Sequence, residues 1–190
     1  MYHGARTHRK SLDLPWDAHY LTFSCFHRQP FFAGRHSTRW FLDALDRARA
    51  KLPFDLWAFV VMPEHAHLVV LPGEGVLIRT ILAQVKHPVT RRALHFLEKN
   101  CPGFANRMAD RQPNGKVTHR FWQRGGGYDR NLRSTRDVHE KIDYIHNNPV
   151  RRHLVERPED WVFSSARAWV EGVDAPIRID RESLPPLEVL

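Results

Sequence analysis

The chain has 190 residues, of which 42% are hydrophobic and 26% charged, with 29 lysines and arginines against 21 acidic residues and a formal net charge of +8. This is typical of one globular domain with its own core. No apolar run reaches the roughly 18 residues that cross a bilayer, and the first residues lack the apolar segment of a signal peptide. Two cysteines are too few for a disulfide framework and form no CxxC pair, so we expect a reducing cytoplasm. Arginine-rich positive charge favours nucleic acid as a partner over a membrane surface, with a basic enzyme that has no nucleic-acid role as the alternative.

The first half of the chain predicts three strands and a helix. Residues 19–26 are rich in aromatic and β-prone side chains and predict a strand. From residue 37 to about residue 52, apolar side chains recur at spacings of three and four, which predicts a helix. Strands are expected at 56–62 and 65–71, with a short break at Pro63 and Glu64.

Helical spacing then resumes, and we expect Pro88 to divide this stretch into two helices, because proline lacks the backbone donor and clashes with the preceding turn. Residues 98–119 predict a long loop, and residues 120–123 predict the fourth strand. The last clear helix is expected at 136–148, since Pro149 disfavours α geometry in the residue before it. A further helical segment follows.

The order β-α-β-β-α-β is that of the split βαβ, ferredoxin-like arrangement. We therefore expect an α+β fold with an antiparallel sheet and an additional C-terminal helix. A single domain is expected over residues 1–175. Prolines mark residues 176–190 as a loose tail.

His65 and His67 are separated by one residue in the third expected strand. Alternate residues of a strand face the same way, so the two imidazoles offer a two-point clamp for a metal. In a chain with 13 histidines, two unrelated surface histidines are the alternative. Further ligands could come from Glu64, which is beside the pair, or from Lys86 and His87 near the expected helix break, but none has diagnostic spacing.

Tyr144 and Asn148 are one helical turn apart in the last expected helix, so they share a face. The amide oxygen of Asn148 could complete a metal site beside the Tyr144 phenol. A packing tyrosine and a helix-ending asparagine are the alternative. A phenol that attacks a phosphodiester keeps the bond energy in a covalent link, so the DNA can be rejoined without another energy source.

Three longer segments resemble a known family. VVMPEHAHLVV resembles the histidine-hydrophobe-histidine motif of the HUH single-strand endonucleases. RFWQRGGGYDRN, followed by KIDYIHNNPVRRHLVERPEDWVFSSARAW, resembles the REP-associated tyrosine transposases, which are relatives of the single-tyrosine insertion-sequence transposases. The resemblance extends from about Tyr20 to Trp169. It implies a ferredoxin-like core, a Mg²⁺ or Mn²⁺ site, and cleavage and rejoining of hairpin-bearing single-stranded DNA through a 5′-phosphotyrosine link.

Position by position, the resemblance implies His65 and His67 as the metal ligands on the strand. It implies Asn148 as the third ligand and Tyr144 as the nucleophile. Among the other tyrosines, Tyr128 is the serious rival, because it follows three glycines and lies among arginines; Tyr2 and Tyr20 are weaker candidates.

Arginines cluster on both sides of the expected catalytic helix, where we expect them to contact phosphates. They are Arg120, Arg124, Arg130, Arg133, Arg136, Arg151 and Arg152, with Arg91 and Arg92 extending the set. Phe121 and Trp122 are expected in the core. The expected partner is single-stranded DNA with a REP-like hairpin, bound by a monomer or homodimer at the nucleoid.

Two other functions fit parts of the sequence. A DNA-binding protein derived from a transposase would keep the fold without the chemistry. A zinc-dependent hydrolase would use His65 and His67, but it needs a further strong ligand and a general base, and the sequence contains no HExxH motif.

Overall fold

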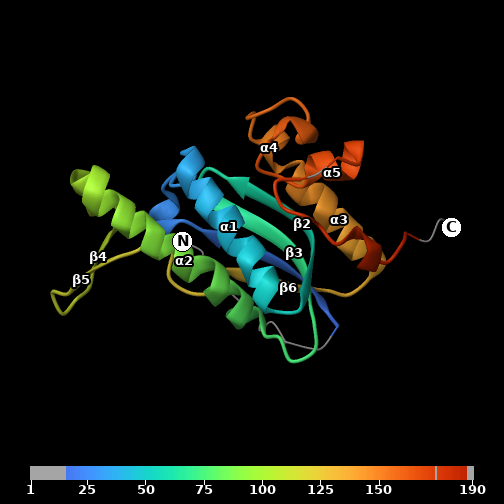
Figure 1. Cartoon of the computed structure of the whole chain (residues 1–190), viewed down its shortest axis with the longest axis horizontal. Coiled ribbons are helices and arrows are strands. Elements are labelled where there is room, and N and C mark those ends of the chain that lie inside the picture. The colour runs from blue at the N-terminus through green and yellow to red at the C-terminus, as the bar shows by residue number, and fades with distance from the viewer. Residues whose placement is uncertain (1–15, 174, 188–190) are drawn as a thin grey trace, which may run out of the picture.

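The computed structural model describes residues 16–173 and 175–187. Four strands form one antiparallel sheet in the order β2-β3-β1-β6 (Figure 1). They are β1 (Ala18–Ser24), β2 (Phe54–Met62), β3 (His65–Pro72) and β6 (Tyr128–Leu132). With β6 as the fourth strand, this is the strand order of the ferredoxin-like βαββαβ fold. The expected α+β class is confirmed.

Helices cover both faces of the sheet (Figure 1). Helices α1 (Arg35–Lys51) and α2 (Ile78–Asn100) pack on each other over one face, and α3 (Thr135–His146) packs on the other. The remaining elements are short: α4 (Asn148–Arg151), α5 (Ala166–Glu171), the 3₁₀ turns η1 (Phe26–Arg28), η2 (Pro102–Met108), η3 (Pro158–Asp160) and η4 (Arg181–Ser183), and the hairpin of β4 (Ala109–Arg111) and β5 (Val117–His119).

Side-chain alternation along β3 divides the interior into two cores. Ala66 and Leu68 are fully buried in the core beneath α1 and α2. Val69 belongs to the core beneath α3. His65 and His67 lie on the same face of the strand as Val69, so both imidazoles face the α3 side, as strand alternation predicts.

Helix α2 continues through Pro88, so the expectation of two helices is wrong. Proline inside a helix costs about 3 kcal/mol or more. On either side of it, however, Val85 and Val89 are completely buried. Burying each such side chain contributes about 1.5–3 kcal/mol, enough to offset the proline. Trp122 Nε1 also donates to the Lys86 carbonyl oxygen at 3.0 Å, which ties this part of the helix to a distant segment.

The fourth strand is β6, so the expectation of a strand at 120–123 is wrong. Phe121 and Trp122 are instead buried in the core beneath α1 and α2, as expected for those two side chains. Aromatic residues are common in strands, which is why residues 120–123 were expected to form one. The actual strand, β6, lies at the sheet edge and buries only Leu132. An edge strand with one buried side chain has little hydrophobic signature.

Two further boundaries differ from expectation. The segment 98–119 is not one loop, because it contains the end of α2, the turn η2 and the β4-β5 hairpin. The helix expected at 136–148 ends at His146, and α4 begins at Asn148. Pro149 cannot donate the next helical hydrogen bond, so the chain breaks before it. Tyr144 and Asn148 therefore lie on consecutive helices.

Residues 175–187 contact the sheet and α1. The Asp180 carboxylate accepts hydrogen bonds from Arg49 Nη2 at 2.6 Å and from the Leu56 amide at 2.8 Å. Trp57 Nε1 donates to Ser183 Oγ at 2.9 Å. Much of the segment expected as a tail thus packs on the domain, and the division at residue 175 stays a prediction. Within the described ranges, no helix has both the length and the apolar character needed to cross a membrane.

Candidate active site

A cavity of about 600 Å³ opens on the α3 side of the sheet. Residues of β1, β3, β6, α3 and α4 line it, together with one residue of η1 and the residue that follows α4. They are Tyr20, Thr22, Ser24, Arg28, His65, His67, Tyr128, Lys141, Tyr144, Asn148, Arg151 and Arg152. The expected nucleophile and the three expected ligands therefore share one cavity, which we call the tyrosine cavity.

Three polar side chains converge at its base. His65 Nε2 lies 3.0 Å from His67 Nε2, and Asn148 Nδ2 lies 3.0 Å from the same His67 nitrogen. The nitrogen and oxygen of an asparagine amide exchange places when the group turns by half a rotation. Turned in this way, Asn148 presents its oxygen to the point where the two imidazoles meet.

Hydrogen bonds on the far side of each ring fix the two imidazoles. His65 Nδ1 lies 3.1 Å from Glu64 Oε1, and His67 Nδ1 lies 2.7 Å from Thr22 Oγ1 and 2.9 Å from Tyr20 Oη. When Nδ1 carries the proton and donates it to these oxygens, each Nε2 keeps its lone pair.

Burial keeps both histidines neutral. It lowers the pKa of His67 to about 3, with a smaller contribution from His65, and it also lowers the pKa of His65. Burial tends to raise the pKa of Glu64, but His65 and Arg152 outweigh it, so that pKa lies below its usual value. At neutral pH the cavity base therefore holds two uncharged imidazoles beside a carboxylate.

These residues fit a divalent cation. Two lone pairs that face each other at 3.0 Å repel unless a proton or a cation lies between them. Neutral imidazoles with their other nitrogen hydrogen-bonded are the usual form of histidine ligands. Donors about 2.1 Å from a shared ion lie about 3 Å apart in adjacent octahedral positions. Across the described part of the chain no three His, Cys, Asp or Glu side chains cluster as a ligand set, so the third donor would be the amide.

Tyr144 lies at the open side of the cavity with 37% of its surface exposed. The Lys141 Nζ lies 5.1 Å and the Arg151 guanidinium carbon 4.9 Å from its ring centroid. Its ring centroid is 6.2 Å from that of His67, at a nearly perpendicular angle. The phenol is thus accessible, with two cations near its ring, and it lies close to the His67 imidazole.

The other tyrosines differ from Tyr144 in exposure. Tyr20 is buried, stacks on the His67 ring, and has its pKa raised to about 12, chiefly by burial. It supports the site and is not free to attack. Tyr128 also lines the cavity and is 47% exposed, but it comes from the edge strand β6. Tyr2 lies outside the described residues.

The seven arginines expected to bind DNA fall into three groups. Arg151 and Arg152 line the tyrosine cavity, and Arg152 Nη1 donates to Glu64 at 2.9 Å. Arg120 and Arg124 both pair with Asp110, away from this cavity.

The third group lies around the start of α3, outside the tyrosine cavity and apart from the pair beside Asp110. Arg130 pairs with Asp137 at 2.8 Å, and Arg136 pairs with Glu140 at 2.9 Å. Arg133 is exposed. For all seven arginines, DNA contact remains a prediction.

Several cavity residues were not identified from the sequence. Lys141 precedes Tyr144 by three residues, so helical spacing could have indicated it. Thr22 reaches His67 because these two residues are paired across β1 and β3, a register that the sequence does not reveal. Arg28 Nη2 lies 3.7 Å from Glu64 Oε1. The backbone of Arg28 itself has a positive φ of 52°. Such a backbone conformation is uncommon for a residue with a side chain, and no sequence pattern predicted it.

The chain is similar in sequence to two known proteins. No family model matches the chain. It is 29% identical over 126 residues to a candidate REP-associated tyrosine transposase of Haemophilus influenzae, and 28% identical over 123 residues to the REP-associated tyrosine transposase of Escherichia coli K12. In sequence, the chain resembles the REP-associated tyrosine transposases. The matched segments cover 66% and 64% of this chain, but only 66% and 60% of the two relatives, which is less than two thirds of either protein.

A solved REP-associated tyrosine transposase, in complex with a REP hairpin, has the same fold. The match covers 94% of this chain and 93% of the other, with a TM-score of 0.64 at 19% identity. The expected resemblance to this family and the expected fold are thereby confirmed.

Proposed function

We propose that this protein is an HUH-type, metal-dependent endonuclease and strand transferase that acts on single-stranded DNA. The observation that carries the proposal is the meeting of His65, His67 and Asn148 within one cationic cavity that also holds the exposed Tyr144 phenol. A scissile phosphate placed there would lie between the expected ligands and the nucleophile.

The reaction begins with the Tyr144 oxygen attacking the phosphorus of a phosphodiester. A bond forms from the phenol oxygen to phosphorus, and the bond from phosphorus to the 3′ oxygen breaks. The phenol loses its proton and the departing 3′ oxygen gains one. The product is a 5′-phosphotyrosine with a free 3′-hydroxyl strand, and attack by another 3′-hydroxyl reverses the chemistry and rejoins DNA.

His65, His67 and Asn148 would hold Mg²⁺ or Mn²⁺, which would supply positive charge to the scissile phosphate as charge builds up on it. The hydrogen bonds that the two Nδ1 atoms donate to Glu64 and Thr22 orient the two imidazoles. Lys141 and Arg151, whose cations lie near the Tyr144 ring, bind the phosphate oxygens and align the phosphorus with Tyr144. Because these groups are set before the substrate arrives, little reorganisation is needed during the reaction.

The proposed substrate is a hairpin with a single-stranded flank. The solved relative is bound to a REP hairpin, and the net charge of +8 suits any such polyanion. We expect the protein to act on the bacterial nucleoid, in the cytoplasm, as a monomer or homodimer.

The proposal is tested by incubating the full chain with an end-labelled hairpin oligonucleotide that carries single-stranded flanks, with and without Mg²⁺ or Mn²⁺. We expect a covalent protein–DNA adduct that survives denaturing electrophoresis and depends on the metal. A band shift under native conditions without any adduct would instead indicate a DNA-binding protein without chemistry. Stoichiometric zinc in the purified protein, without DNA cleavage, would favour a zinc hydrolase.

A further inference from the structure

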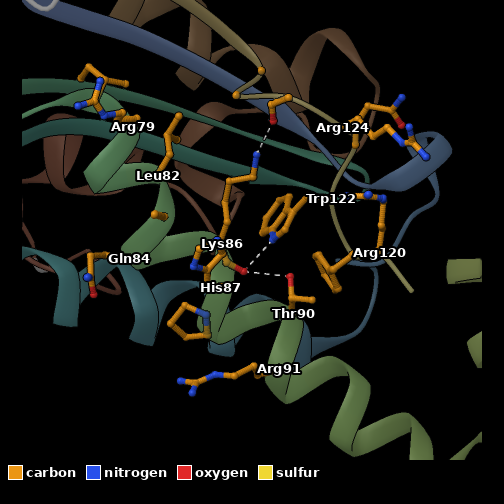
Figure 2. Close-up of a pocket in the computed structure, with 18 of the residues that line it drawn as sticks. Arg79, Leu82, Gln84, Lys86, His87, Thr90, Arg91, Arg120, Trp122 and Arg124 are labelled. Atoms are coloured by element: carbon orange, nitrogen blue, oxygen red, sulfur yellow. Dashed lines mark hydrogen bonds between the residues drawn. The ribbon is translucent and has the colours of Figure 1, made fainter. Parts of the chain in front are cut away.

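A second and larger cavity lies between α2 and the segment 119–127, with a volume of about 980 Å³ (Figure 2). We call it the basic groove. Figure 2 shows Arg79 and Arg91 coming from α2, Arg120 and Arg124 from the facing segment, and Lys86 between them. Helix α2 covers the opposite face of the sheet from α3, so the groove and the tyrosine cavity lie on different faces.

The groove has more positive charge than its carboxylates neutralise. Arg79 and Arg91 are exposed, and neither forms an ion pair with any described residue. Arg120 and Arg124 share a single carboxylate, that of Asp110. Hydrogen bonds from these two arginines lower the pKa of Asp110, and the bond from Arg120 has the larger effect. The single negative charge of Asp110 offsets only one of the two positive charges.

One further carboxylate, that of Asp129, lines the groove and bonds with His19 Nδ1 at 2.7 Å. Lys86 adds a cation at the centre, where its Nζ donates to the Gly125 carbonyl oxygen at 3.2 Å. The Nζ also lies 5.7 Å from the Trp122 ring centroid. An ammonium in this half-buried place has few partners, and an anion in the groove would supply another.

The groove and the tyrosine cavity meet at the edge strand β6. Tyr128 lines the tyrosine cavity, while its neighbours Gly127 and Asp129 line the groove. At Gly127 φ is +96°, and an added Cβ would lie 2.3 Å from the Thr22 carbonyl oxygen, so glycine keeps this crossing close against β1. A Cβ added at Gly125 or Gly126 would meet no atom within 4 Å, so no neighbouring group crowds the chain beside the sheet edge at these two residues.

We propose that the basic groove binds the phosphates of a single-stranded DNA segment that continues from the tyrosine cavity around the sheet edge at Tyr128. This inference rests on the proposed function for the identity of the polyanion. The path favours a single strand because it must turn from one face of the sheet to the other. Duplex DNA has a persistence length of about 150 base pairs and resists such a turn, whereas a single strand does not. Tyr128, half exposed at the crossing, offers a ring on which a base can stack.

The test uses a hairpin of fixed stem with a thymidine flank of 0, 2, 4, 6, 8 or 10 nucleotides at the 5′ end or, separately, at the 3′ end. For the wild-type chain, affinity should rise with flank length on one side. The double variant Arg79→Gln/Arg91→Gln should lose most of that gain but bind the flankless hairpin as the wild type does. Each lost phosphate contact lowers the slope of log K against log salt by about 0.7, so the slope for the long flank should fall by about 1.4.

The matched control is Arg35→Gln/Arg39→Gln, which removes the same charge from exposed positions on α1, outside the groove. It should retain the gain with flank length. Both double variants should have the same melting temperature as the wild type, since all four side chains are exposed. Equal weakening of the flankless hairpin by Arg79→Gln/Arg91→Gln would show that the groove binds the stem, and that would overturn the inference. A gain that survives in this variant would overturn it as well.

These outcomes are separable from those of the proposed function. If flank binding depends on Arg79 and Arg91 but no metal supports a covalent adduct, the proposed chemistry fails and the groove assignment stands. If an adduct forms but flank length has no effect on affinity, only the groove assignment fails.

Discussion

The two cavities on either side of β6 differ in how their polar side chains are held. In the tyrosine cavity, His65, His67 and Glu64 are buried and bonded to neighbouring side chains. In the basic groove, Arg79 and Arg91 are exposed and have no ion-pair partner among the described residues. Bond-breaking chemistry requires groups fixed to a fraction of an ångström, whereas phosphate binding requires accessible charge. The contrast predicts that changes to the buried side chains of the tyrosine cavity alter rate, whereas changes to exposed arginines alter affinity.

The largest effect is expected for His67→Ala or His65→Ala. Either variant should lower the rate of adduct formation by about a thousandfold or more, because the charge that builds up in the transition state loses its stabilisation. Hairpin affinity should remain nearly unchanged, since arginine contacts to phosphate supply most of it. Single-turnover cleavage and a native gel shift measure the two quantities. His95→Ala, at an exposed position on α2, is the control and should cleave normally. Wild-type cleavage by His67→Ala would remove the histidines from the site.

Glu64→Gln should act through His65. The amide still accepts the Nδ1 hydrogen bond but lacks the charge that makes the imidazole a better donor to a cation. Loss of such a supporting group typically costs about 10–100-fold in metal affinity or activity. Mn²⁺ titration followed by electron paramagnetic resonance, in the absence of DNA, measures the affinity directly. Glu74→Gln, at an exposed position, should not change it. Unchanged Mn²⁺ affinity in Glu64→Gln would show that the carboxylate does not orient His65.

Asn148→Ala should reduce cleavage less than loss of either histidine, by about tenfold, because water can replace a neutral oxygen donor. Excess Mn²⁺ should restore part of the rate, since Mn²⁺ binds more tightly than Mg²⁺ to a depleted site. Cleavage measured across a range of metal concentrations separates this from a folding defect. A rate that is independent of the substitution at limiting metal would exclude Asn148 as a ligand.

The smallest effect is expected for Arg136→Gln. Arg136 already pairs with Glu140 one turn along α3, and both side chains are exposed. Removing it should change hairpin affinity by about twofold or less, consistent with the small contribution of exposed ion pairs. Arg151→Gln, which removes a cation lying over the Tyr144 ring, should weaken binding more. Fluorescence anisotropy at one salt concentration measures both affinities. A larger loss of affinity for Arg136→Gln than for Arg151→Gln would mean that DNA lies along the start of α3.

The elements that the sequence predicted best have strong periodicity. β3 and its two histidines followed from alternation, and α1 followed from apolar spacing. The errors came where tertiary contacts outweigh local preference: α2 passes through Pro88 because the flanking valines are buried, and the edge strand β6 lacks an apolar pattern. The donors that hold His67 come from β1, and only the register of the sheet brings them there.

The identity of the attacking tyrosine tests the account most directly. The covalent adduct would be formed with a hairpin oligonucleotide, digested with protease, and the DNA-linked peptide sequenced by mass spectrometry. We expect the link on Tyr144, with no adduct from Tyr144→Phe, normal hairpin binding by that variant, and an adduct still formed by Tyr128→Phe. A DNA-linked peptide that contains Tyr128 instead, or an adduct formed by Tyr144→Phe, would contradict the account.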